Sequence, residues 1–536
     1  MGLLRSDVNF DRKFWHVYFL VLVLICMIEP LYASIYYVDS NDGNDVNAGL
    51  SPQQALRTLQ SVNQKLFQPG DKILFKAGTC YAGRLKPQGS GSEGDPIIID
   101  SYGQGPRPRI DGEGDVPEAM LLHNVEYWEV SNLEFTNLGE EREKNRNGIV
   151  ISLRDFGTAH HIHLKNLLIH SVNGSLLKGR GEGHAIWWNC SGRDKKSCFD
   201  GLLIEGCHIK NCGRNGIKGG GLWSRRNWYP SKNVIIRNNL VEDVPGDGIV
   251  PIACEGAVVE NNVMRDCPPL LPDGEAAAGI WPWSCDNTII QFNEVSDHKA
   301  PWDGQGFDAD YNCRNTVIQY NYSHDNEGGF LLICTPGDRD PNDNIGNIGT
   351  IIRYNVSVND GFRRNPTREG IFSPSFHITG PCRDTQIYDN VIYVTRKPGD
   401  KIDNTLLKMD NWGGTWPENT FFRNNIFYAE DTVKYDFGEA KNTVFENNLY
   451  YGNHINHPND PNAIFGDPLF LKPGSKGPGM QTVFDYQLRY GSPCIAAGRV
   501  VWEKGGRDFA GLPLPDDKLP CIGAFEYVSA SKRNTR

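Results

Sequence analysis

A short apolar run, mostly of β-branched residues, followed by an asparagine recurs along most of this chain. The clearest copies are IIRNNLVED, VVENNVMRD, IIQFNEVSD, VIQYNYSHD, IIRYNVSVN, FFRNNIFYA and VFENNLYYG. Their aligned asparagines are Asn239, Asn262, Asn293, Asn321, Asn355, Asn425 and Asn448, with weaker copies at Asn132, Asn166 and Asn390. From Asn239 onward, neighbouring copies are 23 to 35 residues apart. Short strands repeated at such a period predict a parallel β-helix in which each repeat is one rung.

The repeated polar positions have a structural explanation. An inward asparagine at a corner can bond to the asparagines of the rungs above and below, as in stacked sheets. Four residues later comes a column of aspartates that we interpret as turn formers. Its members are Asp243, Asp266, Asp297 and Asp325. Cysteines also recur at nearly the same place in successive rungs, where we expect them to stack as small buried side chains; these are Cys254, Cys285 and Cys313.

The two ends of the chain depart from the repeat. Residues 34–110 predict an N-terminal cap and first rungs, with a helix near Ser51 whose apolar Leu56, Leu59 and Val62 have helical spacing. Residues 111–464 predict the β-helix, and residues 465–536 a C-terminal cap and tail. Insertions between strands are expected to emerge on one face, which in solenoids is often the binding face. The fold class is therefore all-β, a single solenoid domain closed at both ends.

Composition restricts the compartment and the partners. An apolar run from Phe14 to Ile28, followed by Ala33, predicts a signal peptide over residues 1–33 and hence a secreted, periplasmic or cell-surface protein. Retention of that segment as an anchor is the alternative. The net charge of −11 argues against nucleic acid, because binding phosphates needs clustered Lys and Arg. The sequence predicts a monomer without a cofactor or bound metal. The GDRDPNDN loop at Gly337 resembles a calcium loop only in part, since no glutamate follows at the expected spacing.

The strand after each asparagine can be aligned on a glycine and an apolar residue, as in GIVPIA, GIWPWS, GFDADY and GFLLIC. Because strand side chains alternate, the second and fourth residues after the glycine face outward if the first points inward. One predicted outward column is Lys218, Val250, Trp281, Asp308, Leu331 and Phe372. The neighbouring one is Gly220, Ile252, Trp283, Asp310 and Ile333.

Asp308 and Asp310 are the acids for which this repeat has no structural use. They should lie about 6.5–7 Å apart on one face, about 4.8 Å from the rung that carries Trp281 and Trp283. Two close carboxylates suit cleavage of a glycosidic bond, one as general acid and the other as nucleophile or base. Indole rings suit the apolar face of a sugar. The alternative is a solvated pair of acids on a strand.

Other polar residues are expected near this face. Asp247 and Asp303 precede the strand, where each either joins the catalytic acids or ends a turn. Lys218, His324, Glu327 and Arg364 are further substrate-binding candidates, although an isolated His at such an edge is more often a hydrogen-bonded surface residue.

The chain resembles the secreted right-handed parallel β-helix proteins of polysaccharide-degrading bacteria. The resemblance rests on YYVDSNDGNDVNAGLSP, NTVIQYNYSHDNEGGF, RDFAG and CIGAFEY, which span nearly the whole mature length. Within that group the central rungs are similar to family 141 of the glycoside hydrolases. This resemblance implies a right-handed, pectin-lyase-like helix and an exo-acting or xylan-directed hydrolase of a polysaccharide or oligosaccharide.

Two other functions stay open at this point. A polysaccharide lyase can use the same scaffold, with Lys218 or Arg364 serving an acidic sugar. A non-catalytic carbohydrate-binding or surface protein would use Trp281 and Trp283 but would have no need for paired acids. Fold alone does not decide between them.

Overall fold

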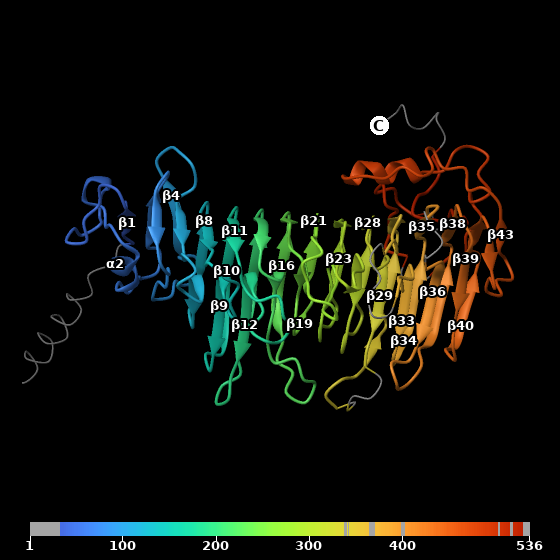
Figure 1. Ribbon diagram of the computed structural model, residues 1–536, viewed down its shortest axis with the longest axis horizontal. Coiled ribbons are helices and arrows are strands. Elements are labelled where there is room, and N and C mark those ends of the chain that lie inside the picture. Colours follow the sequence, from blue (N-terminus) through green and yellow to red (C-terminus); the bar gives the residue numbers. More distant parts are fainter. Residues whose placement is uncertain are drawn as a thin grey trace, which may run out of the picture.

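The structure is a long, narrow solenoid of short strands (Figure 1), which confirms the predicted all-β fold. It is a computed structural model and describes residues 33–336, 340, 342–363, 370–397, 403–501, 504–514 and 518–528. Residues 1–32 of the predicted signal peptide, Arg364 and half of the Gly337 loop therefore lie outside the described residues. No helix in the described ranges is long and apolar enough to cross a membrane.

Three parallel sheets run the length of the solenoid, and each regular rung contributes one strand to each sheet. The path of sheet 1 is β1 (Ile35–Val38), β2 (Lys72–Lys76), β4 (Ile97–Tyr102), β7 (Trp128–Ser131), β10 (Thr158–Lys165), β13 (Cys198–Glu205), β16 (Ser231–Arg237), β20 (Val258–Glu260), β23 (Ile289–Gln291), β27 (Val317–Gln319), β31 (Ile351–Arg353), β34 (Cys382–Tyr388), β37 (Glu418–Arg423) and β40 (Lys441–Glu446), with β19 (Cys254–Glu255) and β30 (Asn347–Ile348) paired to its sides.

Sheet 2 follows the same order of rungs. Its strands are β3 (Cys80–Ala82), β5 (Arg109–Asp111), β8 (Glu134–Asn137), β11 (Leu168–Val172), β14 (His208–Cys212), β17 (Leu240–Glu242), β21 (Val263–Arg265), β24 (Glu294–Ser296), β28 (Tyr322–His324), β32 (Val356–Val358), β35 (Val391–Val394), β38 (Ile426–Ala429), β41 (Leu449–Tyr451) and β43 (Ile464–Phe465).

Sheet 3 carries the predicted acidic strand and is interrupted near it. Its first part is β6 (Glu118–His123), β9 (Asn147–Arg154), β12 (His184–Ser191), β15 (Asn215–Lys218) and β18 (Ile249–Val250). Its second part is β26 (Phe307–Ala309), β29 (Leu331–Cys334), β33 (Phe376–Thr379), β36 (Thr405–Asp410), β39 (Val433–Asp436) and β42 (His454–Ile455). Single bridges from Ile249 to Ile280 and from Ile280 to Phe307 join the two parts. A separate pair, β22 (Ala276–Ala277) and β25 (Trp302–Asp303), lies beside this junction.

The asparagine ladder is confirmed. The amide of Asn321 donates to Asn355 Oδ1 at 3.0 Å and to the Ile290 carbonyl at 2.9 Å. The same bonds repeat from Asn239 through Asn448, where the ladder ends on Asp460. Because the interior offers no water to these amides, each rung satisfies the polar groups of its neighbour.

Two predicted members of the ladder were misplaced. Asn132 and Asn166 adopt positive φ and bond to each other on the surface, one position before the ladder column. The aspartate column is confirmed as a set of turn residues, since all four members have φ between 54° and 57°. The cysteine stack is also confirmed: the Cys254 amide approaches Cys285 Sγ at 3.3 Å, and all three cysteines are buried and free.

The ends of the solenoid differ from each other. The predicted N-terminal helix is two short pieces, η1 (Pro52–Gln54) and α2 (Leu59–Asn63), because Ala55 returns to an extended conformation. Leu56, Leu59 and Val62 are nevertheless buried in the main core. At the other end, the chain from Phe470, including η2 (Met480–Tyr486), folds back over sheet 2 (Figure 1) and forms a second hydrophobic cluster with Tyr322 and Tyr354.

Candidate functional site

The outward face of sheet 3 brings the predicted acids beside the predicted indoles. The bridges from Ile249 to Ile280 and from Ile280 to Phe307 set the register that places Asp308 next to Trp281. Ile280 and Phe307 are buried in the main core, so the predicted inward and outward phase is correct.

In the rung after Asp308, each residue of the outward columns lies one position later in the sequence than predicted. Phe307 pairs with Leu331, so Asp308 is followed by Leu332 and then by His377. One residue more than predicted separates Gly329, which has φ of 106°, from its strand. Asp310 is consequently followed by Cys334 rather than by Ile333. Phe372 is not part of the sheet at all.

The two indoles are covered rather than exposed. Trp281 is only 3% exposed, and its Nε1 donates to Asp247 Oδ1 at 3.2 Å. Trp283 stacks on Trp223, with ring centroids 5.3 Å apart. Trp223 belongs to the insertion between β15 and β16, which folds over this face. The expectation of two exposed stacking platforms was therefore wrong, because Trp281 is buried against its neighbours on the sheet and Trp223 lies over Trp283.

Asp247 lies in a buried ionic cluster. Its Oδ2 is 3.9 Å from Arg214 and 4.0 Å from Lys218, and Lys218 also pairs with Glu182 at 2.7 Å. Burial pushes the pKa of Asp247 up, but Lys178, Arg214 and Lys218 outweigh that effect and hold the pKa at about 2. Asp247 is therefore ionised and inaccessible. Lys218 is buried and paired, which removes it as the free substrate-binding residue or base that the sequence suggested.

Lys178 connects this cluster to the other acids. Its side chain is 38% exposed, but its ammonium lies 4.0 Å from Asp247 Oδ2 and 5.0 Å from the centroid of the Trp281 ring. Burial works against the charge on this ammonium, yet Asp247, Asp303 and Asp310 together raise the pKa of Lys178. Lys178 is thus a fixed cation beside the carboxylates.

Three carboxyl groups of the site, those of Asp303, Asp308 and Asp310, have raised pKa values. Burial, followed by the charges of Asp310 and Asp303, raises the pKa of Asp308 well above its usual value. Burial raises the pKa of Asp310 to about 7, against the opposing influence of Lys178. Burial also raises the pKa of Asp303, again opposed by Lys178. Asp308 is 4% exposed, whereas Asp303 and Asp310 are half-buried and can reach a ligand.

A small pocket opens beside Asp303. Its volume is about 90 Å³, and its lining is Pro301, Trp302, Asp303, Gln305, Arg363, Phe372, His377 and Trp412. His377 Nε2 contacts Asp410 Oδ2 at 2.8 Å, and Trp412 is 40% exposed. The Arg363 guanidinium donates to the carbonyl of Asp303 at 2.8 Å, which fixes the turn that carries this acid. The pocket therefore combines an acid with the aromatic rings of Trp302, Phe372 and Trp412.

The structure does not place every predicted residue here. His324 belongs to sheet 2, where it pairs with Glu294 and Asp325 below the C-terminal segment. Its assignment to this edge was wrong, because the repeat carries its strand to a different face. Glu327 is buried in the turn before β29, next to the turn of Asp303, and its backbone amide donates to the His298 carbonyl at 2.9 Å.

Several residues of the site were missed. Arg214 occupies the position two before the aligned glycine, where the following rungs have Gly246, Ala277 and Gly304. A buried cation in a column of small residues was the available signal. Lys178 lies in an irregular segment, and nothing in the repeat marks it. Cys334, whose Sγ approaches Asp310 Oδ1 at 3.2 Å, was hidden by the register slip.

Asp308, Asp310 and Cys334 could also hold a metal ion, since their ligand atoms all lie within 4.8 Å of one another. Burial raises the pKa of the Cys334 thiol well above its usual value, and nearby Asp308 adds to that shift. A metal ion at this trio would have to displace the proton of the Cys334 thiol.

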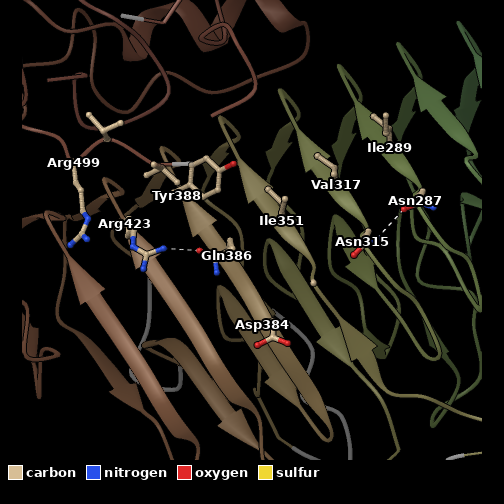
Figure 2. Close-up of a pocket in the computed structure, with 13 residues that line it drawn as sticks. Asn287, Ile289, Asn315, Val317, Ile351, Asp384, Gln386, Tyr388, Arg423 and Arg499 are labelled. Atoms are coloured by element: carbon tan, nitrogen blue, oxygen red, sulfur yellow. Dashed lines mark hydrogen bonds between the residues drawn. The ribbon is translucent and has the colours of Figure 1, made fainter. Parts of the chain in front are cut away.

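A larger cavity, of about 780 Å³, lies on sheet 1 and does not resemble a catalytic site (Figure 2). Ile289, Val317 and Ile351 form its floor, and Asp384 is its one acidic lining residue. Arg423 at its edge already donates to Gln386 at 2.7 Å. The lining of this cavity lacks the pair of carboxylates that hydrolysis requires.

Comparisons with known proteins agree with the fold. The sequence matches a family model described as a right handed beta helix region over residues 119–347. This chain is a right-handed parallel β-helix. A lacto-N-biosidase from Bifidobacterium longum subsp. longum is 29% identical, over 92% of this chain and 36% of that protein. The present chain thus spans little more than a third of the length of that relative.

Two solved structures are similar. The crystal structure of a GH136 lacto-N-biosidase from Eubacterium ramulus has a TM-score of 0.55 at 25% identity, covering 82% of this chain and 70% of that one. The complex of XylC with xylose has a TM-score of 0.51 at 12% identity, covering 92% and 99%, and shows the fold alone. These relatives are not described as family 141 enzymes, and the resemblance to family 141 stays a prediction.

Proposed function

We propose that this chain is a glycoside hydrolase that cleaves a glycosidic bond beside Asp303 and Asp310. The observation that carries the proposal is a group of three carboxyl groups whose pKa values are raised, chiefly by burial, next to an aromatic-lined pocket. Glycosidic cleavage needs one protonated and one ionised carboxyl group at close range. A structural ion pair would not gather acids with raised pKa values in this way.

The accessible acids divide the roles. Asp310, with a pKa of about 7, stays largely protonated in mildly acidic solution and is the proton donor to the departing oxygen. Asp303 lines the pocket and, with Lys178 favouring its ionised form, is the nucleophile or base. Asp308 is buried and its pKa is raised well above its usual value, so it stays protonated and does not touch the substrate. Asp247 is ionised, and it positions the Trp281 indole.

The relatives suggest the first substrate to test. Two of them are named lacto-N-biosidase, and we propose that this chain acts on an oligosaccharide that contains lacto-N-biose. The small pocket suits one terminal sugar ring stacked on Trp302 or Trp412. Secretion, predicted from residues 1–33, fits an external glycan, and the protein is expected to act as a monomer.

A direct test measures release of reducing sugar from a lacto-N-biose glycoside and from a panel of plant and host glycans. We expect turnover on at least one, unaffected by EDTA, and at least a hundredfold loss in Asp303→Asn. Asp297→Asn, in the turn column, is the matched control and should retain full activity.

Two outcomes would overturn the proposal. Products with new ultraviolet absorbance would show β-elimination and assign a lyase. Binding of glycans without turnover would assign a carbohydrate-binding protein.

A further inference from the structure

A group of side chains on sheet 1, away from the proposed active site, has the composition of a metal site. Glu129 lies on β7, and His161 and His163 lie on the adjacent strand β10. His163 is the register partner of Glu129. His161 has φ of 51°, and the residue at its level in the next rung is Gly201, with φ of 91°. Tyr127, at the same level of the preceding rung, has φ of 56°, so this kink in the strand recurs from rung to rung.

The ligand atoms already converge. Glu129 Oε1 is 2.8 Å from His161 Nε2 and 3.6 Å from His163 Nδ1. The two imidazole centroids are 3.8 Å apart, and one possible ligand atom from each residue lies within 4.8 Å of the others. Ligands of a tetrahedral zinc ion with bonds of about 2.0–2.1 Å are about 3.3 Å from one another. The two carboxylate–imidazole distances are therefore within about half an ångström of the separation that zinc requires.

Two further features favour a ligand. His163 Nδ1 is buried and has no hydrogen-bond partner within the described part of the chain. Lys165 Nζ is 3.2 Å from Glu129 Oε2, so one carboxylate oxygen is held while the other faces the histidines. An outer partner of this kind orients a ligating carboxylate. All three ligands are half-buried, which leaves a position open to water.

Single His–Glu pairs elsewhere on the molecule show what is unusual here. On sheet 2, His170 contacts Glu134 at 3.0 Å and His208 contacts Glu242 at 2.8 Å across neighbouring rungs. Each of these has one histidine and forms an ordinary cross-strand pair. Only the Glu129 group, among the described residues, adds a second imidazole whose facing nitrogen has no hydrogen bond.

We propose that Glu129, His161 and His163 bind a divalent transition-metal ion, with Zn²⁺ as the preferred occupant. Two nitrogens and one carboxylate oxygen suit zinc, with water as the fourth ligand, whereas Ca²⁺ and Mg²⁺ prefer oxygen ligands alone. The ion would join β7 to β10 and so tie two rungs of the N-terminal half together. Its role is structural and separate from sugar cleavage.

The test uses the full, tag-free chain after treatment with EDTA and dialysis, in a Cys80→Ser background because Cys80 is an exposed free thiol. Calorimetric titration with ZnCl₂ should give one site and a rise in melting temperature. CaCl₂ and MgCl₂ should give neither. Removing a residue that only supports a metal ligand typically lowers metal affinity by about 10–100-fold. Removing a ligand itself, in His163→Ala or His161→Ala, should therefore weaken zinc binding at least tenfold.

His208→Ala is the matched control and should bind zinc as the parent does. Glu129→Gln keeps the size of the side chain and covers the case in which a histidine variant does not fold. No zinc binding by the parent would overturn the proposal. Unchanged affinity in His163→Ala and Glu129→Gln, both folded by circular dichroism, would also overturn it by placing the bound ion elsewhere.

Discussion

Aspartates occur in two regions of this solenoid and behave differently in each. In the turn column after sheet 2, Asp266 has φ of 55° and a side chain that is 68% exposed. Beside sheet 3, Asp308 is 4% exposed and shares its surroundings with Asp303 and Asp310. The turn acids satisfy local backbone geometry, whereas the covered acids cannot all ionise. Burial and neighbouring charge, rather than residue type or repeat position, separate structural from chemical aspartates.

Asparagines show the same contrast. Asn321 is fully buried and gives its amide hydrogens to Asn355 and Ile290. Asn315, on the exposed edge of sheet 1, bonds to Asn287 at 3.0 Å in a similar ladder (Figure 2). In the exposed ladder, water can replace the partner that a substitution removes.

The largest expected effect tests the two sets of aspartates directly. Asp310→Asn should reduce turnover by a hundredfold or more, because general acid assistance contributes about 10²–10⁴-fold. Asp266→Asn should leave turnover within about twofold of the parent. Initial rates on the best glycan measure both. Equal rates in the two variants would show that the covered acids are not the working groups.

The same substitution has a pH signature. The folded-state pKa of Asp310 is raised from 3.8 to about 7, so its contribution to stability is fully present below about pH 4 and is lost as pH rises towards 7. Asp310→Asn should therefore raise the melting temperature at pH 8 and change it little at pH 4. In the parent, activity should fall as pH rises through about 7, because the proton donor ionises.

The next largest effect concerns the covering of the acidic face. Because Trp281 is buried and bonded to Asp247, Trp281→Ala should lower the free energy of unfolding by about 3–5 kcal/mol. Chemical denaturation measures this loss. A change below about 0.5 kcal/mol would show that the indole is an exposed platform, as the sequence suggested.

The two asparagine ladders give a smaller contrast. Asn321→Ala leaves buried partners in both adjacent rungs unsatisfied and should cost about 1–3 kcal/mol for each such group. Asn315→Gly, which keeps the φ of 55° without strain, should cost less than about 0.5 kcal/mol, since the partner of Asn315 is exposed. Both values come from denaturant unfolding. Equal losses of stability in the two variants would show that burial does not decide how much a ladder asparagine contributes.

The smallest expected effect concerns His324. Burial lowers the pKa of this imidazole, but Asp325 and Glu294 outweigh burial and raise the pKa to about 9. The contribution of His324 to the free energy of unfolding is then fully present below about pH 6.5 and is lost as pH rises through about 9. His324→Gln should destabilise the protein by roughly 1–3 kcal/mol at pH 6 and by less at pH 10. Turnover at pH 6 should be unchanged, which would separate His324 from the substrate-binding residues.

Much of the fold followed from local repetition in the sequence. The spacing of residues such as Asn293 and Asn321 predicted the rungs, because each rung must bond to an identical neighbour. Alternation in GIWPWS and GFDADY predicted that Trp281 and Asp308 lie side by side on the outward face. That inference needs only the geometry of adjacent strands.

The tertiary structure decided what surrounds that face. Trp223 covers Trp283 from an insertion in an earlier rung, and Lys178 reaches the acids from an irregular segment with no counterpart in the repeat. An extra residue after Gly329 placed Leu332 instead of Leu331 next to Asp308, and in the following rung His377 occupies the column predicted for Phe372. Repetition fixes only contacts between equivalent positions of neighbouring rungs. Burial, pKa and access depend on contacts between non-equivalent segments far apart in the chain, and these form only when the solenoid is complete.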